Sequence, residues 1–70
     1  MDRQSVTSSN IRSVGYDPAT DTLEIEFHGG RIYQYDGVPE NVYRGLMAAP
    51  SHGSHFQANV RNTYPFRKIA

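Results

Sequence analysis

Apolar and polar residues alternate strictly in one stretch near the middle of the chain. Leu23, Ile25 and Phe27 fall on one face of an extended segment, and Glu24 and Glu26 fall on the other. One buried face and one solvated face are typical of a strand in an antiparallel sheet. The pattern therefore predicts a half-buried strand here.

A second strand-like segment, residues 10–16, precedes this strand and is rich in β-branched and aromatic residues. Its alternation is imperfect, because Ile11 has the opposite parity to Val14 and Tyr16. A β-bulge adds one residue to a strand and so reverses the parity beyond it. We therefore expect a bulge or a change of register near residues 13–15.

A hairpin turn is predicted at Gly29-Gly30, because glycine adopts the positive φ that such turns need. The returning strand is residues 31–36, and two registers are open. A two-residue loop places Tyr33 and Tyr35 on the exposed face, beside the glutamates. A three-residue loop over 29–31 places both rings in the core, since a slip of one residue reverses every side chain. We favour the second register, because strand tyrosines are more often covered than exposed.

The remainder of the chain predicts two short helices. Pro39 suits the first turn of one helix and Pro50 ends it, while Phe56 and Val60 lie one turn apart on the next. We therefore expect an α+β fold, with a three-stranded antiparallel β-meander followed by two short helices packed on one face. Residues 64–69 are extended, either as a short C-terminal strand or across the helices.

The 70 residues are enough for one domain. We expect residues 1–7 to be a flexible N-terminus and residues 8–70 to form the single domain. The chain has no cysteine, so neither disulfides nor a thiolate zinc site can stabilise it. Stability must come from packing or from oligomerisation. No signal peptide or apolar span is recognisable, and we expect a cytoplasmic protein with no membrane partner.

The net charge of zero conceals an asymmetry along the sequence. All seven acidic residues lie at or before Glu40, and the chain after it has four basic residues and no acidic one. Residues 61–68 interleave cations with aromatic rings, a composition that suits phosphate contacts and base stacking. The alternative is that Tyr64 and Phe66 pack in the core while the cations extend outward.

Candidate catalytic and metal-binding residues are few. His52 and His55 have the H-x-x-H spacing of two metal ligands, but no cysteine or acidic residue follows Glu40 to supply a third. Ser51 and Ser54 are explained by helix capping. The sequence therefore indicates no enzyme active site, no metal site and no cofactor.

Taken in order, several short motifs resemble the KTSC domain, a small bacterial and phage domain named for its place at the C-terminus of some lysyl-tRNA synthetases. These motifs are Ser8-Ser9-Asn10-Ile11 with Gly15-Tyr16-Asp17, Tyr33-Gln34-Tyr35 before Gly37-Val38-Pro39, Ser51 with Gly53 and Phe56, and Arg61 with Tyr64-Pro65. The resemblance extends from about Ser8 to Ile69 and implies a stand-alone copy of the domain. The family has no established function, and its synthetase context suggests RNA binding.

These observations predict a small non-enzymatic binding module whose partner is nucleic acid, with single-stranded RNA favoured. The candidate binding residues are Tyr33, Tyr35, Arg44, Arg61, Tyr64, Arg67 and Lys68. The alternative is a protein-interaction or accessory domain, including a homodimer formed through an apolar face or a sheet edge.

Overall fold

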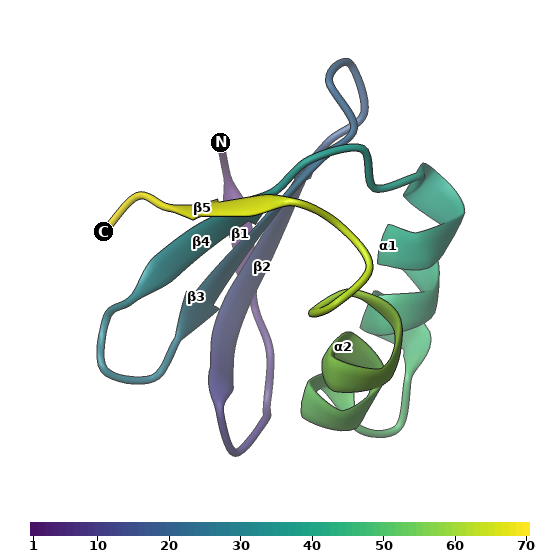
Figure 1. Cartoon of the computed structure of the whole chain (residues 1–70). Coiled ribbons are helices and arrows are strands. Elements are labelled where there is room, and N and C mark those ends of the chain that lie inside the picture. Colours follow the sequence, from purple (N-terminus) through teal and green to yellow (C-terminus); the bar gives the residue numbers. More distant parts are fainter.

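The computed structural model describes all of residues 1–70 and has two helices packed on one face of a five-stranded antiparallel sheet (Figure 1). The strands lie side by side in chain order. The elements are β1 (Arg3–Ser5), β2 (Ile11–Asp17), β3 (Thr22–Phe27), β4 (Ile32–Tyr35), α1 (Glu40–Ala48), α2 (His52–Asn59) and β5 (Phe66–Lys68). The expected α+β fold is confirmed, and β5 is the C-terminal strand.

The bulge in β2 brings residues of opposite parity onto one face. Ile11 lies opposite Phe27, whereas Ser13 lies opposite Glu26, so Arg12 is the additional residue. Ile11 and Val14 are consequently both buried in the core. The bulge lies just before the region where the sequence predicted it.

The β3–β4 hairpin closes through a three-residue loop, residues 28–30. The Phe27 amide donates to the Arg31 carbonyl at 2.8 Å, so these two residues oppose each other. Gly29 and Gly30 have φ values of 99° and 90°, which explains why glycine occupies both positions. Both expected registers began the loop at Gly29, whereas it begins at His28, so both were wrong in detail.

The face on which the tyrosines lie is nevertheless the favoured one. Tyr35 lies opposite Leu23 and Tyr33 lies opposite Ile25. The favoured register had placed Tyr35 opposite Ile25 and Tyr33 opposite Phe27, so each observed partner lies two residues earlier in β3. A shift of two residues leaves every side chain on the same face of the sheet. Tyr35 is only 4% exposed and Tyr33 is half-buried against the core.

The structure adds β1, a strand that the sequence did not predict. It lies within the segment that we expected to be a flexible N-terminus, and Gln4 pairs with Val14 of β2. β1 contains no apolar residue, so its sequence gives no strand pattern. The pairing depends instead on Gly15, because an added Cβ there would lie 2.8 Å from the Asp2 carbonyl oxygen.

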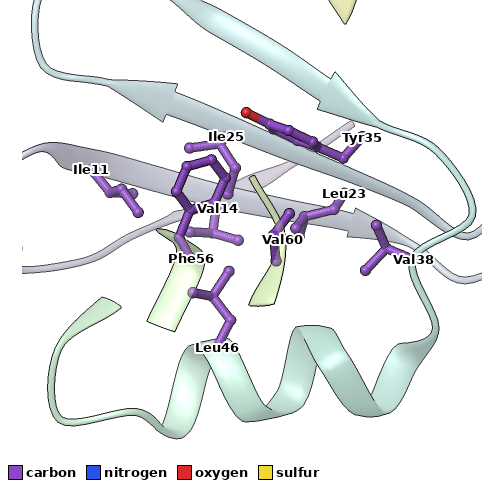
Figure 2. Close-up of a cluster of buried hydrophobic side chains, with 9 residues drawn as sticks. All are labelled: Ile11, Val14, Leu23, Ile25, Tyr35, Val38, Leu46, Phe56 and Val60. Carbon is purple, nitrogen blue, oxygen red and sulfur yellow. The ribbon is translucent and has the colours of Figure 1, made fainter. Parts of the chain in front are cut away.

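Both helices begin and end where the local sequence requires. Pro39 precedes the first residue of α1 and Pro50 follows its cap, while the Ser51 hydroxyl caps α2 by accepting from the Ser54 amide at 3.3 Å. Sheet and helices enclose one apolar core, in which Leu46 and Phe56 project toward the strands (Figure 2). The core residues are Ile11, Val14, Leu23, Ile25, Tyr35, Val38, Leu46, Phe56 and Val60.

A hydrogen-bonded network crosses the sheet on the face away from the helices. Glu24, 4% exposed, accepts from Gln34 at 2.8 Å and forms an ion pair with Arg3 of β1. Gln34 in turn accepts from Arg67 of β5 at 2.7 Å. Burial alone would raise the pKa of Glu24, but the hydrogen bonds from Gln34 and Arg3 outweigh burial and hold the pKa below its usual 4.5.

Glu24→Gln is expected to lower the free energy of unfolding at neutral pH by about 1–3 kcal/mol, because the Arg3 guanidinium loses its buried counter-charge. Because the pKa of Glu24 is lower in the folded state than in the unfolded state, its ionisation stabilises the fold above the unfolded pKa, and this stabilisation is lost as pH falls through the folded pKa. The difference in unfolding free energy between wild type and Glu24→Gln should therefore shrink below pH 4.5. Urea unfolding across pH measures it, with Glu40→Gln as the exposed control. A gap that is constant with pH would contradict this role.

Gly15→Ala is expected to destabilise the domain by about 1–3 kcal/mol, since the new methyl group collides with the backbone of the segment leading into β1. Gly45→Ala is the matched control. Its Cβ would lie 3.4 Å from the nearest atom, within α1, where alanine is favoured by about 1 kcal/mol. Thermal unfolding should give opposite signs for the two variants. Equal effects would mean that the β1 contact has no influence on stability.

Candidate functional site

A groove of about 440 Å³ opens where the β3–β4 hairpin, α2 and β5 meet. The segment before β2 contributes Asn10 to its lining. The elements come from distant parts of the sequence, and Figure 1 shows β5 beside β4, with the segment from the end of α2 leading into β5. Five aromatic side chains line it: Phe27, Tyr33, Tyr35, Phe56 and Phe66.

The five aromatic rings contact one another in a closed circuit. The circuit runs Phe27, Tyr33, Phe66, Tyr35, Phe56 and back to Phe27, with neighbouring centroids 5.4–5.7 Å apart. Interplanar angles of 38–82° show that neighbouring rings are tilted or edge-to-face. Phe56 and Tyr35 are buried at the base, whereas Phe66 is 58% exposed. The groove therefore has two buried rings at its base, two half-buried rings and one exposed ring.

Two arginines supply all the formal charge of the lining. The Arg31 guanidinium carbon lies 5.7 Å from the Phe27 ring centroid, at the distance of a cation–π contact. Burial and, to a smaller extent, the nearby Tyr33 raise the pKa of Tyr35 to about 12, and the positive charge of Arg61 partly offsets them. Arg61 therefore favours negative charge at the Tyr35 hydroxyl.

The rest of the lining consists of neutral amides and contains no carboxylate. Asn10, Gln57 and Asn62 contribute these amides. Asn10 is held by the Ser8 hydroxyl, which donates to its side-chain oxygen at 3.3 Å. It packs against Gly53, where any side chain would collide with the amide. The groove thus presents donors and acceptors around an aromatic base, in a positive field.

The structure brings three of the predicted site residues together in this groove: Tyr33, Tyr35 and Arg61. Tyr64 instead packs at the border of the core. The sequence also missed several lining residues, chiefly Arg31 and Phe27. The sequence signal that could have paired them is the predicted hairpin, because residues on either side of a hairpin loop are cross-strand neighbours.

The other predicted cations lie outside the groove. Arg44 pairs with Glu40 at 2.7 Å on the exposed side of α1. Arg67 donates to Asp36 at 2.5 Å and belongs to the network on the opposite sheet face. Lys68 lies on β5 opposite Tyr33 and does not line the groove. The C-terminal positive charge is therefore distributed over several surfaces.

The two histidines at H-x-x-H spacing contribute to helix packing. His52 donates from Nδ1 to the Leu46 carbonyl at 2.9 Å, and His55 packs against Gly45. No cluster of three or more metal-ligating side chains occurs in the structure. The contacts of both histidines fix the junction between α1 and α2.

The sequence profile of the KTSC domain matches residues 7–64. The chain belongs to the KTSC domain family. An uncharacterized protein of Stutzerimonas stutzeri is 46% identical over 56 residues, which cover 80% of this chain and 79% of that protein. A lysine–tRNA ligase of Nostoc punctiforme is 37% identical over 62 residues, covering 89% of this chain but only 11% of the ligase.

A crystal structure of a KTSC domain protein from Yersinia pestis has the same fold. It superposes with a TM-score of 0.93 at 44% identity and covers 99% of this chain and 97% of that one. Within the KTSC domain described here, neither helix is long and apolar enough to cross a membrane. Of the groove residues, Phe66 alone lies outside the matched range of 7–64.

Arg61→Gln is expected to raise the pKa of Tyr35 above its value of about 12, because the positive charge that opposes the effect of burial is removed. NMR titration of tyrosines labelled with ¹³C at the phenolic carbon measures this pKa directly. Arg12→Gln, which removes an exposed arginine outside the groove, is the control and should leave the pKa unchanged. Unchanged titration in Arg61→Gln would mean that the guanidinium does not face the hydroxyl.

Proposed function

We propose that this KTSC domain is a non-enzymatic module that binds single-stranded RNA through the aromatic groove. The observation that supports the proposal is the composition of the lining. Five aromatic rings, two arginines and three amides face one cavity that contains no carboxylate. Proteins that bind unpaired nucleic acid combine these groups, with rings for the bases and cations for the backbone.

Base stacking needs an accessible ring, and Phe66 provides it. Its side chain is 58% exposed, yet its ring is held 5.7 Å from the centroids of both Tyr33 and Tyr35. A base that stacks on a ring already held in place loses less conformational entropy than one that must order a free side chain. Such stacking contributes about 1–3 kcal/mol per base.

The charge of the groove supports weak, salt-sensitive binding. Arg31 and Arg61 line it and form no ion pair, whereas Arg3, Arg44 and Arg67 are paired with carboxylates. If each groove arginine neutralises one phosphate of a single strand, log affinity falls with log salt with a slope of about −1.4, from ~0.7 per contact. We expect dissociation constants on the order of 10⁻⁴–10⁻⁶ M.

The relatives favour RNA over DNA as the ligand. Among them are lysine–tRNA ligases, in which a region similar to this chain covers 11% of the sequence. A module attached to an enzyme named for tRNA is well placed to contact an RNA. That argument is an analogy of context, and the groove itself carries the proposal.

The test is a titration of ¹⁵N-labelled protein with a short mixed-sequence RNA at low and high salt. Shifts are expected at Arg31, Tyr33 and Arg61 and in β5, and they should weaken as salt is added. Phe66→Ala should reduce affinity by about 1–3 kcal/mol, and Arg61→Gln should reduce the salt slope by about 0.7. Arg12→Gln is the charge-matched control and should leave both unchanged.

The outcome that rejects the proposal is an absence of shifts at the groove with millimolar RNA in low salt. The alternative function, a protein-interaction domain including a homodimer, predicts different behaviour. An apolar interface would be insensitive to salt, and self-association would make the sedimentation coefficient depend on protein concentration. These measurements separate the two functions without a known partner.

A further inference from the structure

We infer that the groove holds a single nucleotide, with one unpaired base against Phe66 and its phosphate on Arg31 and Arg61. This inference rests on the proposed function and narrows it, because many single-strand binders instead track several successive nucleotides. The alternative would be a platform along which a strand runs. The shape, the polar lining and the distribution of charge each favour one nucleotide.

The shape is that of a short, half-open groove. Its lining comes from ten residues of the hairpin, α2 and the turn after it, β5 and the segment before β2, so the lined surface is small. The volume of about 440 Å³ lies near the lower end of the ~300–1,000 Å³ of small-molecule sites. An OB-fold that follows a strand contacts about 4–16 nucleotides. Phe66 is the one exposed ring of the five, so one planar group can stack on the cluster.

The polar lining determines what kind of planar group fits. A ring of aromatic side chains is also how proteins bind quaternary ammonium groups. Here the two charged lining residues are Arg31 and Arg61, and no carboxylate offsets them. A cation would therefore be repelled. A neutral base whose edge meets the amides of Asn10, Gln57 and Asn62, and whose attached group is anionic, satisfies the whole lining.

Lys68 of β5 lies opposite Tyr33, on the groove side of the sheet, and is the cation beyond the lining that a bound strand would meet first. Arg67 and Arg44 are both committed to carboxylates, at 2.5 and 2.7 Å. The other large stacking pair, Tyr16 and Tyr43, is occupied with itself, with parallel rings at a centroid distance of 4.8 Å. A second base therefore finds no second exposed aromatic ring beside the groove, and Lys68 is the one cation left for a second phosphate. Binding should depend on one nucleotide and one phosphate.

The experiment compares AMP, adenosine, ribose 5-phosphate, the dinucleotide ApA and a longer oligoadenylate by ¹⁵N NMR titration. AMP should shift the groove amides, and both adenosine and ribose 5-phosphate should bind about fivefold or more weakly, since each lacks one of the two contacts. Per-site affinities of AMP, ApA and the oligoadenylate should agree within about threefold. Added salt should weaken AMP binding and leave adenosine binding nearly unchanged, because the phosphate supplies the electrostatic contact.

Variants separate stacking from simple apolar contact. Phe66→Leu keeps an apolar side chain of similar size without the ring and should weaken AMP binding about fivefold or more. Phe66→Tyr keeps the ring and should bind AMP as wild type does. Both replace a side chain that is 58% exposed, so the fold should persist, and the amide spectrum verifies this. Equal AMP affinity in Phe66→Leu would overturn the stacking role.

The two proposals fail in different ways. If the oligoadenylate binds and affinity rises about tenfold with each added nucleotide, RNA binding stands and the single-nucleotide pocket is overturned. If AMP binds and no RNA strand does, the pocket stands and strand binding is overturned. If neither AMP nor RNA shifts the groove amides, both are overturned.

Discussion

The pairing of β3 with β4 is the constraint on which both the core and the groove depend. It places Tyr35 opposite Leu23 and Tyr33 opposite Ile25, so both tyrosines face the helices. A register shifted by one residue would turn both rings to the opposite face, because side chains alternate along a strand. The helices would then lose their largest buried contact on β4, and the groove would lose two of its five rings.

The two faces of the sheet are stabilised by different interactions, apolar packing on one and a charged hydrogen-bond network on the other. The helix-side face buries apolar groups, and at its β4–β5 border the aromatic cluster reaches the surface through Phe66. The other face buries a carboxylate, Glu24, which is stable there because Arg3 and Gln34 satisfy it. That network links β1 to β3 and β4, and Arg67 extends it to β5, so one charged group ties both edge strands to the meander.

Non-covalent contacts alone hold this small domain together, since it contains no cysteine. The close contacts of Gly15 with β1 and of Gly53 with Asn10 show how tightly its parts approach. The same closeness serves the groove, because Gly53 lets Asn10 lie at its rim. A binding surface made of packed rings and a held amide is preorganised, which reduces the entropy lost when a ligand binds.

The sequence by itself determined the local elements: the β3 alternation, the glycine hairpin, both helices with their proline boundaries, and a bulge near its true position. These follow from interactions among neighbours in the chain, which pattern and propensity report. It did not reveal β1, whose pairing involves the close approach to Gly15 and an ion pair between Arg3 and the distant Glu24. Nor did it reveal the groove, where Arg31 and Arg61 meet while Arg67 turns to the opposite face. Only the tertiary structure decided which cations remain free and share one cavity, because ion pairing and proximity depend on residues that are far apart in the chain.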